Sequence, residues 1–199
     1  MRDLVACYPS FVPTSEWLAD LAPERVRPLK RVEYERLAET GFFDEERLEL
    51  LDGVIVEMSP QDPAHSATVA RLAELLMRVV PDKQVRAHAP FAVSAESLLE
   101  PDVAVLPRSD DEEAHPDVAF LLVEVSNSSL RKDRSLKSKA YARAGVPEYW
   151  VVNLVERQVE VRARPIDGAY SVTSIARPGD TIRVASLGDL VLAVDDFLR

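Results

Sequence analysis

The chain has 199 residues, 47% of them hydrophobic, which is enough to bury the core of one domain. Its formal net charge of −10 argues against a dedicated high-affinity coat protein for nucleic acid, although a local basic patch would still suit a nuclease. Cys7 is the only cysteine, which excludes an intrachain disulfide and a thiolate metal cluster.

The sequence also predicts where in the cell the protein is found. No apolar run approaches the ~18 residues of a membrane span. The N-terminus lacks the charged-then-apolar order of a signal peptide, so we expect a cytoplasmic protein.

The first 28 residues are irregular and contain four prolines, which are Pro9, Pro13, Pro23 and Pro28. The run Thr14-Ser15-Glu16 is suited to cap a short helix that extends through Leu21. We therefore predict an N-terminal extension over residues 1–28, packed on the body or on a partner, followed by one domain over residues 29–199.

A β-hairpin gives the strongest turn signal in the chain. Its predicted arms are Arg47–Leu51 and Val54–Met58, and the pair Asp52-Gly53 between them is typical of a tight turn. Glu49 lies on the first arm. It is either an exposed strand acid or a third ligand of an acidic metal cluster, bound directly or through water.

Two helices are predicted on either side of this hairpin. The first covers Val32–Thr40 and ends at Gly41. The second covers Pro63–Val80 and is amphipathic, with one apolar side that contains Val69, Leu72, Leu76 and either Val79 or Val80. His65 lies in the first turn of the second helix, where a histidine is more often a surface or capping residue than a ligand.

The segment Gln84–Ser94 is predicted to form one strand, and Ala95–Leu99 leads from it to the next. His88 lies within this strand, and His115 lies in a later polar loop. Neither histidine has a neighbouring motif, so we interpret both as structural or exposed.

Two short apolar runs each carry one carboxylate at an end. Asp102 opens the predicted strand Val103–Leu106, and Glu124 lies near the end of the run Ala119–Val125. If the two strands pair as antiparallel neighbours, the start of the first lies beside the end of the second. Two adjacent carboxylates ionise cheaply only around a divalent cation, and oxygen ligands favour Mg²⁺ or Mn²⁺.

The helix predicted over Arg134–Ala144 supplies a positive charge to this pair. An inward-facing stripe is predicted from its apolar residues at helical spacing, which are Leu136, Ala140, Tyr141 and Ala144. Lys137 borders the stripe, whereas Lys139 lies about 200° further round the helix and faces water. We therefore expect Lys137 to point toward the carboxylates.

The same segment is locally basic. Six of the thirteen residues from Arg131 to Arg143 are basic, against one acid, Asp133. The run is either a solvated helix face or a binding site for the phosphates of nucleic acid. In the second case the candidate contacts are Arg131, Lys132 and Arg134.

Beyond this helix the sequence predicts a series of strands and an apolar ending, which are Glu148–Asn153, Gln158–Arg164, Ser171–Ala176, Thr181–Val184 and Leu187–Leu198. There is no internal repeat, no phosphate-binding glycine loop and no Gly-x-Ser-x-Gly elbow. With only 6 glycines in the chain, the phosphate-loop nucleotide enzymes are not expected.

Together these motifs resemble the Uma2 family, bacterial proteins assigned to the PD-(D/E)XK restriction-endonuclease-like superfamily. The resemblance covers roughly residue 29 to the C-terminus and rests on Pro101-Asp102, Glu124-Val125-Ser126, Asp133, Lys137, Tyr141 and the run from Gly145 to Trp150, with Glu49 to Gly53 and His65 upstream. It implies an α/β fold with a mixed, largely antiparallel sheet flanked by helices. The superfamily's Glu-x-Lys would place lysine at Ser126, and the Uma2 pattern implies that Lys137 replaces it.

The resemblance implies an endonuclease that uses Mg²⁺ or Mn²⁺ to hydrolyse the phosphodiester bonds of nucleic acid, with DNA as the expected substrate. In this hypothesis Asp102, Glu124 and the backbone carbonyl of Val125 hold the metal. Lys137 orients the attacking water or stabilises the pentavalent phosphorus, and His65 assists proton transfer or positions the substrate.

Two other functions stay open. The overall acidity and the serine at position 126 favour a non-catalytic protein that keeps the fold as a binding or oligomerisation module. A metal-dependent hydrolase of a small phosphorylated substrate would use the same acids. We also expect a homodimer, because the proline-rich extension and the apolar ending offer surfaces for a second copy.

Overall fold

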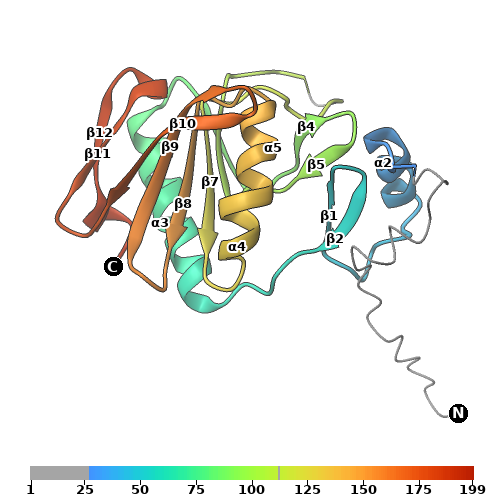
Figure 1. The fold of residues 1–199 in the computed structure, drawn as a ribbon, viewed down its shortest axis with the longest axis horizontal. Helices are drawn as coiled ribbons and strands as arrows, with labels where there is room; N and C mark the ends of the chain where they lie inside the picture. The colour runs from blue at the N-terminus through green and yellow to red at the C-terminus, as the bar shows by residue number, and fades with distance from the viewer. Residues whose placement is uncertain (1–26, 112) are drawn as a thin grey trace, which may run out of the picture.

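The computed structural model describes residues 27–111 and 113–199, and Figure 1 shows how their elements are arranged. Cys7 and the helix predicted from Thr14 to Leu21 lie outside the described residues, as does nearly all of the predicted extension. Among the helices that the structure describes, none has the length and apolar character needed to cross a membrane.

A six-stranded sheet forms the body of the molecule (Figure 1). Its strand order is β10-β9-β8-β7-β6-β3, and within the described chain β7–β8 is its one parallel pair. The strands are β3 (Gln84–Ala87), β6 (Val103–Leu106), β7 (Leu121–Ser126), β8 (Glu148–Asn153), β9 (Gln158–Ile166) and β10 (Ala169–Ala176). This sheet, with helices on its faces, confirms the predicted α/β fold.

Helix α3 (Pro63–Val79) covers one face of this sheet. Its apolar stripe, which includes Leu72 and Leu76, packs against Val123 and Trp150 in the main core. The helix begins as its sequence dictates, because the first helical position is a proline, whose missing N–H needs no partner there.

The connection from β7 to β8 covers the opposite face (Figure 1). It consists of α4 (Leu130–Lys132), a π-helical turn (Asp133–Lys137) and α5 (Ser138–Arg143), as the crossover between parallel strands requires. Tyr141 of α5 packs against Leu122 of β7. Side chains alternate along a strand, so Glu124 faces the same side as Leu122. Both faces are covered, and every residue of β7 is buried.

A second, four-stranded sheet has the order β2-β1-β5-β4 and packs against the α5 side of the body. Its strands are β1 (Leu48–Leu51), β2 (Val54–Glu57), β4 (Phe91–Ser94) and β5 (Ser97–Leu99), and α2 (Arg31–Glu39) lies on it through Tyr34. The predicted β1–β2 hairpin is confirmed. Its turn residues Asp52 and Gly53 have φ of 48° and 77°, and two positive φ values are those of a type I′ turn.

The C-terminal segment folds back on the body instead of projecting from it. β11 (Thr181–Val184) and β12 (Leu190–Ala193) form a two-stranded ribbon, and Phe197 is fully buried beside Trp150. The apolar ending therefore belongs to the core of its own chain, which removes one of the two reasons for expecting a homodimer.

Two details of the predicted secondary structure are wrong. The segment Gln84–Ser94 is not one strand, because His88 adopts a positive φ of 48° and Pro90 cannot donate to a strand ladder, so β3 and β4 separate into different sheets. Leu136 is not in the inward stripe but is 52% exposed. The π turn that contains it is wider than an α turn and changes the direction of the side chains before α5.

The tight approach of the β1–β2 turn to residue 28 can be tested with two glycines of nearly equal φ. A Cβ on Gly53 (φ +77°) would lie 2.2 Å from the Cβ of Pro28, whereas a Cβ on Gly145 (φ +76°) would meet nothing within 4 Å. We expect Gly145→Ala to lower the free energy of unfolding by about 1 kcal/mol through backbone strain. Gly53→Ala should lower it by about 2–4 kcal/mol, because overpacking adds to that strain.

Urea denaturation of the two variants measures the difference. Equal losses would contradict the contact between the turn and Pro28.

Candidate active site

Two acids predicted to meet lie side by side at the end of the central sheet. β6 and β7 are antiparallel, with Val103 opposite Val123, so one further step of the register places Asp102 beside Glu124. Both are buried. The backbone N–H of Val125 donates to Oδ2 of Asp102 at 2.7 Å, which fixes that carboxylate against β7.

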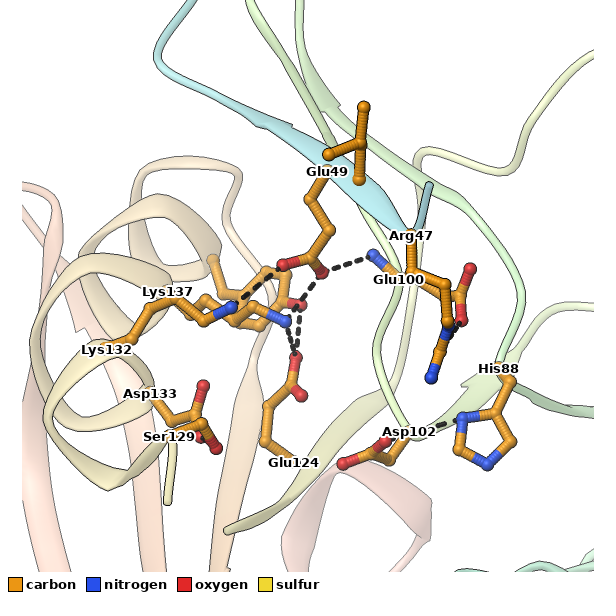
Figure 2. A network of polar contacts seen from close by, with 12 residues as sticks. Arg47, Glu49, His88, Glu100, Asp102, Glu124, Ser129, Lys132, Asp133 and Lys137 are labelled. Carbon is orange, nitrogen blue, oxygen red and sulfur yellow. Dashed lines mark hydrogen bonds and ion pairs between the residues drawn. The ribbon is translucent and has the colours of Figure 1, made fainter. Parts of the chain in front are cut away.

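Lys137 connects two buried glutamates (Figure 2). Its Nζ donates to Oε1 of Glu49 at 2.7 Å and to Oε1 of Glu124 at 2.9 Å, and the three side chains are 3%, 2% and 6% exposed. Burial lowers the pKa of Lys137, but the two carboxylates outweigh burial and raise the pKa above its usual value. The expected orientation of Lys137 is confirmed, and its amine is charged at neutral pH.

The two glutamates share this charge unequally. Burial raises the pKa of Glu49, but Lys137 and Lys132 outweigh it, so the pKa of Glu49 is lowered. For Glu124, which also accepts a hydrogen bond from the Tyr141 hydroxyl at 2.8 Å, burial dominates and the pKa is raised well above the usual value. Burial thus makes the Glu124 carboxylate costly to ionise, and a bound cation would lower its pKa.

Ser126, at the position of the superfamily's lysine, holds a further acid. Its hydroxyl donates to Oδ2 of Asp133 at 2.6 Å, and the Ser129 hydroxyl donates to the same oxygen at 2.5 Å. Asp133 is buried, and within the described chain its Oδ1 has no hydrogen-bond partner. The replacement of lysine by serine thus fixes an additional carboxylate in the site.

His65 reaches the acids from the start of α3. The side chain of Asp62 caps this helix by accepting a hydrogen bond from the backbone N–H of His65 at 2.8 Å. The ring Nε2 lies 3.1 Å from Oδ1 of Asp102, without the alignment of a hydrogen bond. Burial lowers the pKa of His65, but the contact with Asp102 outweighs burial and raises it.

His88 also belongs to this site, which the sequence analysis missed. Its Nδ1 lies 3.4 Å from Oδ1 of Asp102. The signal that identifies it is the antiparallel register of β3 and β6, because Ala87 pairs with Val103 and the next step places His88 beside Asp102. A single predicted strand over Gln84–Ser94 concealed this relation.

The three basic candidates for phosphate binding lie in different places relative to the pocket. Lys132 lines the pocket and lies 3.3 Å from Oε2 of Glu49, and Arg131 is exposed in an adjoining groove that Lys132 shares. Arg134 is not brought to the pocket, because its guanidinium binds Glu160 and Glu156 near β9. Their role in binding phosphate stays a prediction.

The residues of the pocket fit a divalent cation. Six carboxylates and two lysines line it, so the pocket carries a net negative charge. The acids are Glu49, Asp62, Glu100, Asp102, Glu124 and Asp133, and the lysines are Lys132 and Lys137. The buried Oδ1 of Asp133 without a partner is a second sign of missing positive charge. Carboxylate and carbonyl oxygens are the ligands that Mg²⁺ and Mn²⁺ prefer.

The buried amine can be tested by Lys137→Met in the presence of EDTA. At pH 8 we expect the free energy of unfolding to fall by about 3–5 kcal/mol, because two buried carboxylates lose their counter-charge. Without the amine, the pKa of both glutamates rises in the folded state above the usual 4.5. The loss therefore grows as the pH rises through that value and levels off above the raised pKa, so it is smaller at pH 5.5 than at pH 8.

Lys132→Met is the matched control, since Lys132 contacts the same Glu49 from a partly exposed position. We expect it to cost less than about 1 kcal/mol. Urea denaturation at the two pH values measures both variants, and equal losses would refute the central role of Lys137.

The chain matches the family model of Uma2, described as "Putative restriction endonuclease", over residues 31–195. Among solved structures it is similar to a putative nuclease belonging to DUF820 from Anabaena variabilis ATCC 29413, with a TM-score of 0.67. The two are 19% identical over 86% of this chain and 98% of that chain, a likeness that shows the fold. No curated protein matches. Since the family model spans most of its length, the chain belongs to the Uma2 family.

Proposed function

We propose that the protein is a nuclease that uses Mg²⁺ or Mn²⁺ to hydrolyse phosphodiester bonds, with DNA as its substrate. The observation that carries the proposal is the pair of buried carboxylates at the end of β6 and β7, where Asp102 lies beside Glu124 in a pocket lined by six acids and two lysines. The description of the family supports the same class of reaction.

Asp102, Glu124 and the carbonyl of Val125 are the groups that would hold the ion. When bound, the ion lowers the pKa of a water molecule and neutralises charge on the phosphate. Lys137 lines the same pocket with a charged amine, so it is suited to hold a phosphate oxygen or to orient the attacking water. Glu49 fixes this amine through a 2.7 Å contact and would reach the ion through water.

His65 is suited to move a proton at the edge of the site. Its imidazole is buried beside Asp102, and the ring of a histidine can accept or donate a proton near neutral pH. Outside the pocket, Arg131 and Lys132 share a groove in which phosphates next to the cleaved bond would bind. Arg134 plays no part in this proposal, because Glu160 and Glu156 neutralise it.

The proposal is tested by Asp102→Asn. The asparagine keeps an oxygen to accept the hydrogen bond from the Val125 N–H but loses the negative charge. With Mg²⁺ or Mn²⁺ present, we expect cleavage of plasmid DNA to fall at least ~100-fold, the size of effect seen when one charge-stabilising group is removed. The thermal melting curve of the apoprotein should stay close to that of the wild type.

Asp82→Asn is the control for the loss of one negative charge, since Asp82 is 72% exposed and binds Lys83 on the surface. It should cleave at the wild-type rate. Wild-type cleavage by Asp102→Asn would remove the assignment.

A non-catalytic binding or oligomerisation module is the second candidate function, favoured by Ser126 in place of the superfamily's lysine. Calorimetric titration with Mg²⁺ separates the two, because a module has no need to bind an ion at Asp102 and Glu124. A small phosphodiester offered as substrate would identify the third possibility, a hydrolase of small molecules. The homodimer also stays a prediction, which sedimentation velocity would check.

A further inference from the structure

Asp102 has neighbours on two sides. In the strand order β7-β6-β3 it lies between Glu124 on β7 and His88, which follows β3 (Figure 2). Its two carboxylate oxygens point to different sides. Oδ2 accepts the hydrogen bond from Val125, and Oδ1 faces the rings of His65 and His88.

The three ring and carboxylate atoms are spaced as ligands of one ion. Nε2 of His65 and Nδ1 of His88 lie 3.1 Å and 3.4 Å from Oδ1 of Asp102, and all three atoms lie within 4.8 Å of one another. Two ligand atoms that are each ~2.1 Å from a metal are separated by ~3.0 Å across a right angle and ~3.4 Å across a tetrahedral angle. The two separations measured from Oδ1 of Asp102 match these values.

The present contacts of both histidine nitrogens are ones that an ion would replace. Nε2 of His65 is buried, and among the described residues it has no hydrogen-bond partner, which is unusual for a buried polar atom. Nδ1 of His88 lies 3.2 Å from the amide nitrogen of Gln61, a contact that an ion would replace. His88 also holds a positive φ of 48°, and strained backbone of this kind is concentrated at functional sites.

The chemistry of these ligands differs from that of the Glu124 side. Imidazole suits ions such as Zn²⁺, Fe²⁺ and Ni²⁺, whereas Mg²⁺ and Mn²⁺ prefer oxygen ligands, and Mg²⁺ retains its water. We propose that His65, His88 and Asp102 form a second metal site, which binds a first-row transition-metal ion and shares Asp102 with the Mg²⁺ or Mn²⁺ position of the proposed function. It goes beyond that function, because it adds a second ion and, while that ion is bound, makes His65 a ligand and not a proton carrier.

The test is titration of the full-length protein, free of any histidine tag, with Co²⁺, followed by visible absorption and by calorimetry. We expect one Co²⁺ to bind with the absorption bands of nitrogen ligation, and His65→Gln and His88→Asn each to weaken binding by about tenfold or more. Asparagine tolerates the positive φ at position 88, so the backbone of that variant is preserved. Melting curves without metal confirm that both variants fold.

His115→Asn is the matched control, because the chain has three histidines and the ring of His115 is 40% exposed beside Glu35. It should bind Co²⁺ as the wild type does, and an excess of Mg²⁺ should not displace the ion. Glu124→Gln should also keep Co²⁺ binding, so this result is independent of whether the protein cleaves DNA. Unchanged Co²⁺ affinity in His65→Gln or His88→Asn, or displacement by Mg²⁺, would overturn the proposal.

Discussion

The site depends on one buried amine that joins three separate parts of the fold. Lys137 lies in the π turn of the β7–β8 crossover, Glu124 on the central sheet and Glu49 on the second sheet. A charged group is costly to bury, and these contacts offset that cost only while all three parts are in place. The same contacts add to the apolar packing that holds the second sheet against the body, so they contribute both to the stability of the fold and to the shape of the pocket.

This arrangement brings a lysine to the acids although the Glu-x-Lys position holds serine. Ser126 fixes Asp133 at the start of the crossover. The π turn that follows directs Lys137 inward to the position beside Glu124. The positive charge is thus supplied from a helix instead of a strand, and the position it leaves is used to add another carboxylate.

Much of the site could be predicted from the sequence because antiparallel pairing is a strong constraint. Once Asp102 and Glu124 were placed at opposite ends of neighbouring strands, their proximity followed. The inward direction of Lys137 also followed from helical spacing, although Leu136 was assigned to the same stripe and is exposed.

The remaining errors have one kind of cause. A π turn and the break in the backbone at His88 are local departures from regular geometry, and a periodic pattern does not record them. Charged contacts between residues far apart in sequence are equally hidden from a local pattern. The position of Arg134 in a basic run could not reveal its ion pair with Glu160, which lies on a strand further along the chain.

The long separation in sequence between Lys137 and its partner Glu49 also affects how the chain folds. Glu49 and Lys137 are 88 positions apart, so their contact forms only after the chain has closed a large loop. Before that stage the acids and the amine are dispersed and hydrated, and they have no reason to gather an ion. A copy in which the hairpin has not docked therefore lacks the assembled pocket, and under the proposed function it would not cleave nucleic acid until folding is finished.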